Sequence, residues 1–213
     1  ADQYGLATLA NIGTGLTGAL QLFGVHELCI MTIEQPDLVD AYLAYEHQIT
    51  LHTIEQLKDL SIDIVRRNGF YETADYYSPT MLEQFLGERL RKEAEAARAA
   101  GMVTSYTVHT GIMPILDYLA ALPLDSLFGI DLAFKGVKPT EVRDRLAPTK
   151  SFWTGPSNSY HLWQSSDATR QAVQETFDVF GKTGLILSPC VSAHSILPWE
   201  NTMAMIDTWR KLR

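Results

Sequence analysis

Short apolar runs alternate along this chain with helical segments that end at a glycine. The run from Val103 to His109 follows a segment that ends at Gly101, and the run from Leu185 to Cys190 follows one that ends at Gly181. Strands that alternate with helices predict a parallel sheet. In parallel α/β folds the chemistry lies beyond the carboxyl ends of the strands. We therefore expect His109 and Cys190 to converge on one site, where both are good ligands for a divalent metal.

Length, charge and cysteine content narrow the class of protein. The chain has 213 residues, of which 46% are hydrophobic, so it can bury a large core, and residues 1–213 are expected to form a single domain. Its formal charge of −8 argues against a nucleic-acid partner, because phosphate binding needs clustered Lys and Arg. We expect no signal peptide, and no apolar run has membrane-spanning length. Two distant cysteines form no disulfide framework, so we expect a cytoplasmic protein.

Hydrophobic spacing predicts six strand–helix units without a repeat or a linker. The strands are expected at residues 7–12, 61–65, 103–109, 126–130, 150–153 and 185–187. Six units fit an open doubly wound sheet or most of an eight-unit barrel. A barrel that lacks two strands has unpaired edges, so either strands precede Ala1 or a partner covers the gap. Because the chain starts with Ala rather than Met, we expect a preceding segment to be missing from this sequence.

Helix start and stop signals predict where helices lie between these strands. Helices are expected near residues 16–23, 36–60, 78–101, 114–122 and 166–181, with short ones after Lys138 and from Pro198 onward. Ser78-Pro79 is a clear helix start, because a capping hydroxyl precedes a proline in the first turn. Residues 25–32 are ambiguous, and a short helix is one reading of them.

Several segments from Ser78 onward share an order and a spacing with a known family. They are residues 78–85, 96–101, 106–111, 153–156, 166–173, 185–190 and 198–205. Together they resemble the uroporphyrinogen decarboxylase superfamily, which also contains the methylcobamide:coenzyme M methyltransferases and related corrinoid-dependent methyltransferases. The resemblance is looser over residues 1–68. It implies an α/β fold, a (β/α)8 TIM barrel of the uroporphyrinogen decarboxylase type, of which this chain holds the later strands.

The methyltransferase branch of that superfamily implies a zinc site. It holds zinc with a His-x-Cys pair after one strand and a cysteine after the last; the zinc activates a thiol, and a corrinoid supplies or accepts the methyl group. His109 and Cys190 match and are the implied metal ligands. However, Thr110-Gly111 stands where Cys-Gly is expected, and threonine is not a normal replacement for a thiolate. The resemblance thus implies an incomplete zinc ligand set and a corrinoid as substrate or partner group.

Further candidate site residues follow other predicted strands. Asp131, Asn158 and Asn68 are candidate catalytic residues that would orient a substrate, although each could equally cap a loop. Asn11 and Tyr71 are candidate cofactor-binding residues. Tyr71 belongs to an aromatic cluster with Tyr76 and Tyr77, which could line a flat apolar ligand or cover an open barrel edge.

For the arginine pair, the remaining histidines and the second cysteine, the sequence gives weaker indications of role or location. Arg66 and Arg67 could hold substrate carboxylates or be solvated. His161 and His194 lie in polar loops near the expected site, and Cys29 is expected in the core. The other histidines, His26, His47 and His52, are expected on the surface.

Three functions stay open on this basis. The favoured one is a methyltransferase-like activity on a one-carbon or corrinoid-linked substrate, in which His109 and Cys190 bind a metal or the acceptor thiol. The second is a cofactor-free porphyrinogen decarboxylase, which needs cations to hold carboxylates and one acid to protonate a pyrrole. The third is a catalytically silent homologue that binds a corrinoid or a corrinoid protein. A homodimer is also compatible with this sequence.

Overall fold

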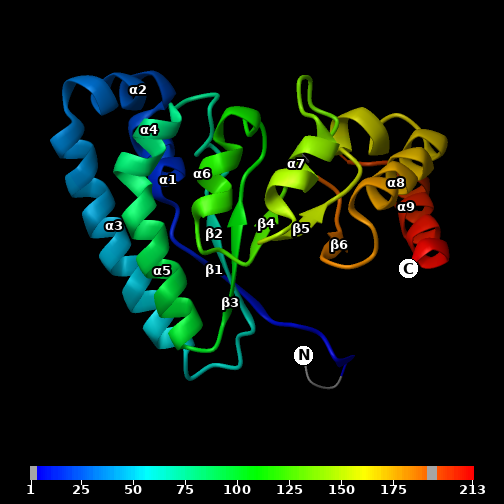
Figure 1. The fold of residues 1–213 in the computed structure, drawn as a ribbon, viewed down its shortest axis with the longest axis horizontal. Coiled ribbons are helices and arrows are strands. Elements are labelled where there is room, and N and C mark those ends of the chain that lie inside the picture. The colour runs from blue at the N-terminus through cyan, green and yellow to red at the C-terminus, as the bar shows by residue number, and fades with distance from the viewer. Residues whose placement is uncertain (1–3, 191–195) are drawn as a thin grey trace. The chain divides into compact units, whose positions relative to one another are not determined.

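The computed structural model describes residues 4–190 and 196–213. The chain divides into two compact units, one formed by Ala1–Val108 with Ala121–Asp125 and the other by His109–Ala120 with Ser126–Arg213. In each unit parallel strands alternate with helices (Figure 1). The predicted α/β class is confirmed.

The first unit contains three parallel strands, β1 (Leu9–Ile12), β2 (Ile64–Asn68) and β3 (Val103–Thr107), with β2 paired to both others. Its helices are α1 (Gly15–Phe23), α2 (Val25–Glu34), α3 (Pro36–Leu57), α4 (Pro79–Leu82), the π-helical segment η2 (Glu83–Gly87) and α5 (Glu88–Ala99). The Ser78 hydroxyl caps α4 by accepting from the Met81 amide at 3.2 Å, as the sequence predicts. Helix α3 begins with a proline, Pro36, as α4 does. At this position a backbone amide would have no hydrogen-bond partner within the helix, so its absence from proline costs nothing.

The core of the first unit lies between its sheet and helices α3 and α5. Its central cluster consists of Ile12, Ile54, Val65, Ala97 and Met102. Side chains alternate between the two faces of a strand. Arg67 lies two positions after Val65, so its side chain is on the same face of β2, which the helices cover. Full burial of an aliphatic side chain stabilises a fold by about 1.5–3 kcal/mol, and this cluster therefore fixes which face of β2 is inside.

The second unit contains β4 (Ser126–Phe128), β5 (Ser151–Thr154) and β6 (Leu185–Leu187), with β5 paired in parallel to both neighbours. Its helical segments are η3 (Met113–Ile115), α6 (Leu116–Ala121), α7 (Pro139–Leu146), the π-helical η4 (Asn158–Leu162), α8 (Ser166–Phe180) and α9 (Trp199–Leu212). Leu162, Val173 and Met205 form a buried cluster that joins η4, α8 and α9.

One predicted strand is displaced in the structure, and one ambiguous segment is resolved by it. The strand expected at residues 61–65 lies at Ile64–Asn68, because the chain after α3 first makes a turn. Asp63 ends that turn, since its carboxylate accepts from the Thr8 amide at 2.6 Å and so sets the start of the strand pair. The ambiguous residues 25–32 are helical and belong to α2.

No single helix of the described residues is both long and apolar enough to cross a membrane. Helices α1 and α2 meet that test only as a pair, and the chain bends by 113° between them.

Candidate metal centre

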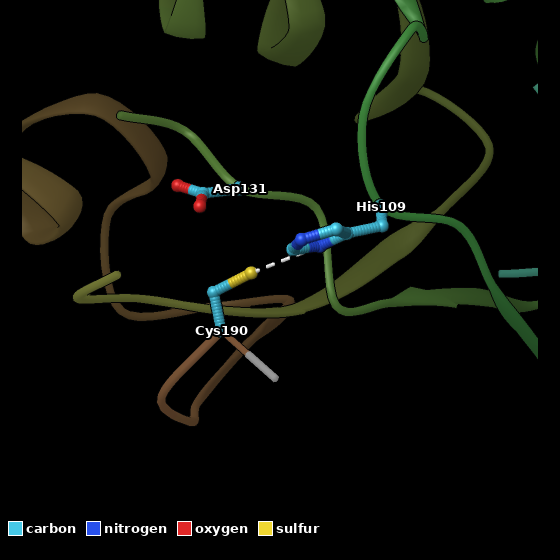
Figure 2. A group of neighbouring side chains, drawn as sticks. All are labelled: His109, Asp131 and Cys190. Carbon is cyan, nitrogen blue, oxygen red and sulfur yellow. Dashed lines mark hydrogen bonds between the residues drawn. The ribbon is translucent and has the colours of Figure 1, made fainter. Parts of the chain in front are cut away.

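Three potential metal ligands of the second unit meet in space. His109, Asp131 and Cys190 each offer one ligand atom, and these atoms all lie within 4.8 Å of one another (Figure 2). The Cys190 Sγ atom lies 3.3 Å from Nδ1 of His109. The predicted convergence of these two residues, which are 81 positions apart in the chain, is therefore confirmed. None of the three belongs to a strand; each lies in the loop that follows one.

The carbonyl of Gly129 holds the thiol and the imidazole together. The Cys190 thiol donates to this oxygen at 3.0 Å, and Nδ1 of His109 lies 2.9 Å from it. Gly129 has a φ of +89°, which a residue with a side chain rarely adopts. This glycine is thus needed to turn its carbonyl toward both side chains.

Asp131 is held in place by two hydrogen bonds. The residue is 3% exposed; its Oδ1 accepts from the Ala133 amide at 3.0 Å, and its Oδ2 accepts from the Ser157 hydroxyl at 2.9 Å. Outer partners of this kind fix the orientation of a metal ligand. The carboxylate is therefore oriented before any ion arrives.

Ser157 also connects the loops that carry Asp131 and Cys190. It is fully buried and forms a parallel bridge with Cys190, whose amide donates to the Pro156 carbonyl at 2.9 Å. Its own amide donates to Nδ1 of His161 at 3.0 Å. The loop after β5 therefore supports Asp131 through the serine side chain and Cys190 through the backbone.

The charges of this group fit a divalent cation. Burial, together with the nearby Asp131 carboxylate, raises the pKa of the Cys190 thiol, so the thiol is protonated at neutral pH when no cation is bound. A bound divalent ion deprotonates a coordinating thiol, and its two positive charges balance the resulting thiolate and the carboxylate. Nitrogen, oxygen and sulfur are all zinc ligands. The triad can therefore bind a metal such as zinc.

Comparison with known proteins bears on the fold. No protein-family model matches the chain, and no curated protein matches it. Among solved structures, a methyltransferase from Methanosarcina mazei matches 97% of this chain with a TM-score of 0.80 and 18% identity. The chain is similar in fold to a methyltransferase. It spans 59% of the length of that structure.

A second solved structure, a trimodular GH5_4 subfamily endoglucanase, matches with a TM-score of 0.48 and 12% identity, over 96% of this chain and 45% of its own. The match to the methyltransferase concerns the fold, since the identity is low. Because the chain covers only part of the longer methyltransferase, its parallel strands and helices correspond to part of the predicted TIM barrel.

Asn158 is the other predicted site residue of the second unit. It is 5% exposed and begins η4, directly after Ser157. Its Oδ1 atom has no hydrogen-bond partner among the described residues. A buried amide oxygen without a partner is costly, so it is suited to accept a hydrogen bond from a bound molecule.

The predicted site residues of the first unit are engaged locally. Asn11 is exposed, and its Oδ1 accepts from Nε of Arg66 at 3.1 Å. Oδ1 of Asn68 accepts from the Phe70 amide at 3.3 Å, which closes a turn. The Tyr71 ring packs edge-on against Phe70, with ring centres 4.9 Å apart. The catalytic role of Asn68 and the cofactor-binding roles of Asn11 and Tyr71 stay predictions.

Arg67 lies in a buried cluster of charges that the sequence analysis did not identify. The residue is 2% exposed, so it is not solvated. Its Nε donates to Glu93 at 2.7 Å, and its terminal nitrogens lie 3.8 Å from Glu72 and 3.7 Å from Glu46. Burial alone would lower the pKa of Arg67, but these three carboxylates raise it above its ordinary value. Arg67 is therefore committed to the protein's own carboxylates.

Glu72 extends this cluster to the start of α1. Its Oε1 accepts from the Leu16 amide at 2.7 Å, and its Oε2 accepts from the Tyr106 hydroxyl. Burial raises the pKa of Glu72, although Arg67 and the tyrosine hydrogen bond oppose this shift. Gly15 lies against the cluster with a φ of +49°, and a Cβ atom there would meet Arg67 and Glu72 at 2.4 Å. The cluster thus fixes the junction of β1 and α1.

The surface expectation for His47 is wrong. Its side chain is 13% exposed, and its Nδ1 lies 2.7 Å from Glu93, because α3 turns this position toward α5. The expectation for Cys29 is met in part, since the residue is half-buried. His161 is half-buried near Ser157, and His194 lies outside the described residues.

The sequence did contain a signal for the charge cluster around Arg67. Val65 and Arg67 are two positions apart in a strand, which puts the arginine on the same face as the apolar valine.

Proposed function

We propose that this chain carries the metal centre of a zinc-dependent, corrinoid-linked methyltransferase of the uroporphyrinogen decarboxylase type. The observation that carries the proposal is the His109–Asp131–Cys190 triad, whose ligand atoms lie within 4.8 Å of one another. The fold similarity to an archaeal methyltransferase supports the reaction class. The sequence resemblance, on different grounds, points to the same chemistry.

In this proposal Asp131 is the third metal ligand rather than only an orienting residue. The sequence has threonine where the resemblance implies a second cysteine, which left the ligand set incomplete. The structure brings a buried carboxylate to the two matching ligands. Three protein ligands with a fourth position left for a substrate are typical of catalytic zinc sites.

The chemistry divides between the ion and the residues around it. A bound zinc ion would supply a Lewis acid that keeps an acceptor thiol ionised at neutral pH. Ser157 holds the Asp131 carboxylate through its hydroxyl, and Gly129 holds the cysteine and histidine. The unpartnered Oδ1 of Asn158 would accept a hydrogen bond from the substrate and orient it. The methyl group would come from a corrinoid, free or carried by a partner protein.

The first alternative, a porphyrinogen decarboxylase, has less support. That reaction needs free cationic side chains to hold substrate carboxylates, and Arg67 is already paired with Glu93, Glu72 and Glu46. The second alternative, a catalytically silent homologue that binds a corrinoid, is distinguished from the enzyme by a methyl-transfer assay.

A methyl-transfer assay tests the proposal directly. We expect zinc-loaded protein to transfer the methyl group of methylcobalamin to 2-mercaptoethanol, followed by the loss of methylcobalamin absorbance. Cys190→Ser should lower the rate more than a hundredfold, because it removes a ligand. Cys29→Ser is the matched control and should stay within about twofold, since Cys29 is not among the candidate metal ligands.

Two other outcomes of these measurements would overturn the proposed methyltransferase activity. Zinc and corrinoid binding without methyl transfer indicates the silent homologue. Metal-free protein that releases carbon dioxide from uroporphyrinogen indicates the decarboxylase.

Zinc affinity should rise with pH. Because the buried Cys190 thiol has a raised pKa, it is protonated at pH 7, and zinc must displace that proton. One displaced proton predicts a roughly tenfold gain in affinity per pH unit between about pH 7 and 8.5. Competition with a chromophoric chelator at several pH values measures the slope. A flat profile would show that the thiol is not a ligand.

A further inference from the structure

The second unit contains a cavity of about 210 Å³ that the metal centre does not use. One wall is a face of α8, and the others come from the start of α7 and from the loops after β4 and β5. The lining residues are Leu132, Ala133, Pro139, Gly155, His161, Ala172, Glu175, Thr176 and Val179. None of the three candidate metal ligands is among them. Most of this wall is apolar, as is typical of small-molecule sites.

His161 gives the cavity a neutral hydrogen-bond donor. Its Nδ1 accepts from the Ser157 amide at 3.0 Å, so Nδ1 carries no hydrogen and the remaining hydrogen is on Nε2. Burial lowers the pKa of His161, which also favours the neutral ring. Among the described residues Nε2 has no hydrogen-bond partner, so this N–H is left to bind a ligand or water.

Glu175 gives the cavity its charge. It is the one acidic side chain among the lining residues. Its Oε1 accepts from the Gln171 amide group at 2.8 Å, one helical turn earlier. Thr176 adds no free donor, because its hydroxyl donates to the Ala172 carbonyl at 2.7 Å. The wall therefore attracts a cation and repels an anion.

These groups define the chemistry of a matching ligand. We infer that the cavity binds a small aliphatic amino alcohol. Its ammonium group lies against Glu175, its hydroxyl oxygen accepts from Nε2 of His161, and its hydrocarbon chain packs on Leu132 and Val179. The acceptor is a neutral oxygen rather than a carboxylate, because a carboxylate would be repelled by Glu175. This site does not depend on the proposed methyl transfer or on a bound metal.

Binding is measured with 4-amino-1-butanol as the probe, by NMR of the methyl groups of Ala133, Ala172 and Val179 in the whole chain. We expect a dissociation constant on the order of millimolar, as suits so few ligand atoms. 1,4-Butanediol lacks the cation and should bind at least tenfold more weakly. Butylamine lacks the hydroxyl and should bind about fivefold more weakly.

Variants assign the two polar contacts. Glu175→Gln should weaken binding of the amino alcohol about tenfold. The matched control is Asp178→Asn, since Asp178 accepts from Gln174 at 2.8 Å in the same i,i+4 arrangement but does not line the cavity. His161→Phe should reduce binding of the amino alcohol to the level of butylamine. Equal binding of all three probes, or equal effects of the Glu175 and Asp178 variants, would overturn the inference.

Discussion

Replacement of Arg67 with methionine is expected to lower the free energy of unfolding by about 3–5 kcal/mol at pH 7. The variant keeps an unbranched side chain but leaves Glu93, Glu72 and Glu46 without their shared cation. Glu72 and Glu93 are almost completely buried, so water cannot replace the arginine. Urea unfolding followed by circular dichroism measures the loss.

The adjacent residue supplies the control for this prediction. Arg66 is half-buried on the opposite face of β2 and makes a hydrogen bond to Asn11, so Arg66→Met should cost less than about 1 kcal/mol. The deficit of Arg67→Met should also shrink as the pH falls from 7 to 5. Burial raises the pKa of Glu72 and Arg67 opposes that shift, so without the arginine the folded state binds more protons at this residue and gains stability at lower pH. Equal losses in the two variants would refute the role given to Arg67.

Loss of any one ligand of the candidate metal centre should lower zinc affinity more than a hundredfold. The variants are His109→Ala, Asp131→Asn and Cys190→Ser. The expected size follows because even the removal of an outer hydrogen-bond partner costs about 10–100-fold. The aspartate variant is the most informative, because asparagine keeps the shape of the side chain while it removes the charge and one of the two acceptor oxygens.

Ser157→Ala gives the graded comparison. It removes the hydroxyl that donates to Asp131 at 2.9 Å and leaves all three ligands, so zinc affinity should fall by about 10–100-fold. Competition with a chromophoric chelator ranks the four variants against wild-type protein. Wild-type affinity in Asp131→Asn would exclude the carboxylate as a ligand and return the centre to the incomplete pair predicted from the sequence.

The fold was largely predictable from local signals. Apolar runs bounded by glycines located the strands, and the serine and proline at residues 78 and 79 located a helix start. The strand expected at residues 61–65 was displaced, because its position depends on Asp63 and Thr8, which are 55 residues apart. Such a contact leaves no local pattern in the sequence.

The candidate site was predictable only in part. Position after a strand indicated His109, Asp131 and Cys190, yet nothing local shows that Asp131 lies within ligand distance of the other two. The charge cluster was missed for a similar reason. Glu46, Glu72 and Glu93 belong to separate elements, and each looks like an ordinary surface residue until the fold brings it to Arg67.

If Asp131 supplies an oxygen ligand as proposed, it affects which competing metal ions the centre would bind in a cell. Copper(I) binds best to soft sulfur ligands, whereas a carboxylate suits harder ions. A monovalent ion would also leave a thiolate and a carboxylate with a net negative charge in a buried place, which is unfavourable. An aspartate in place of the second sulfur that the resemblance implies would therefore bias the proposed centre against binding copper.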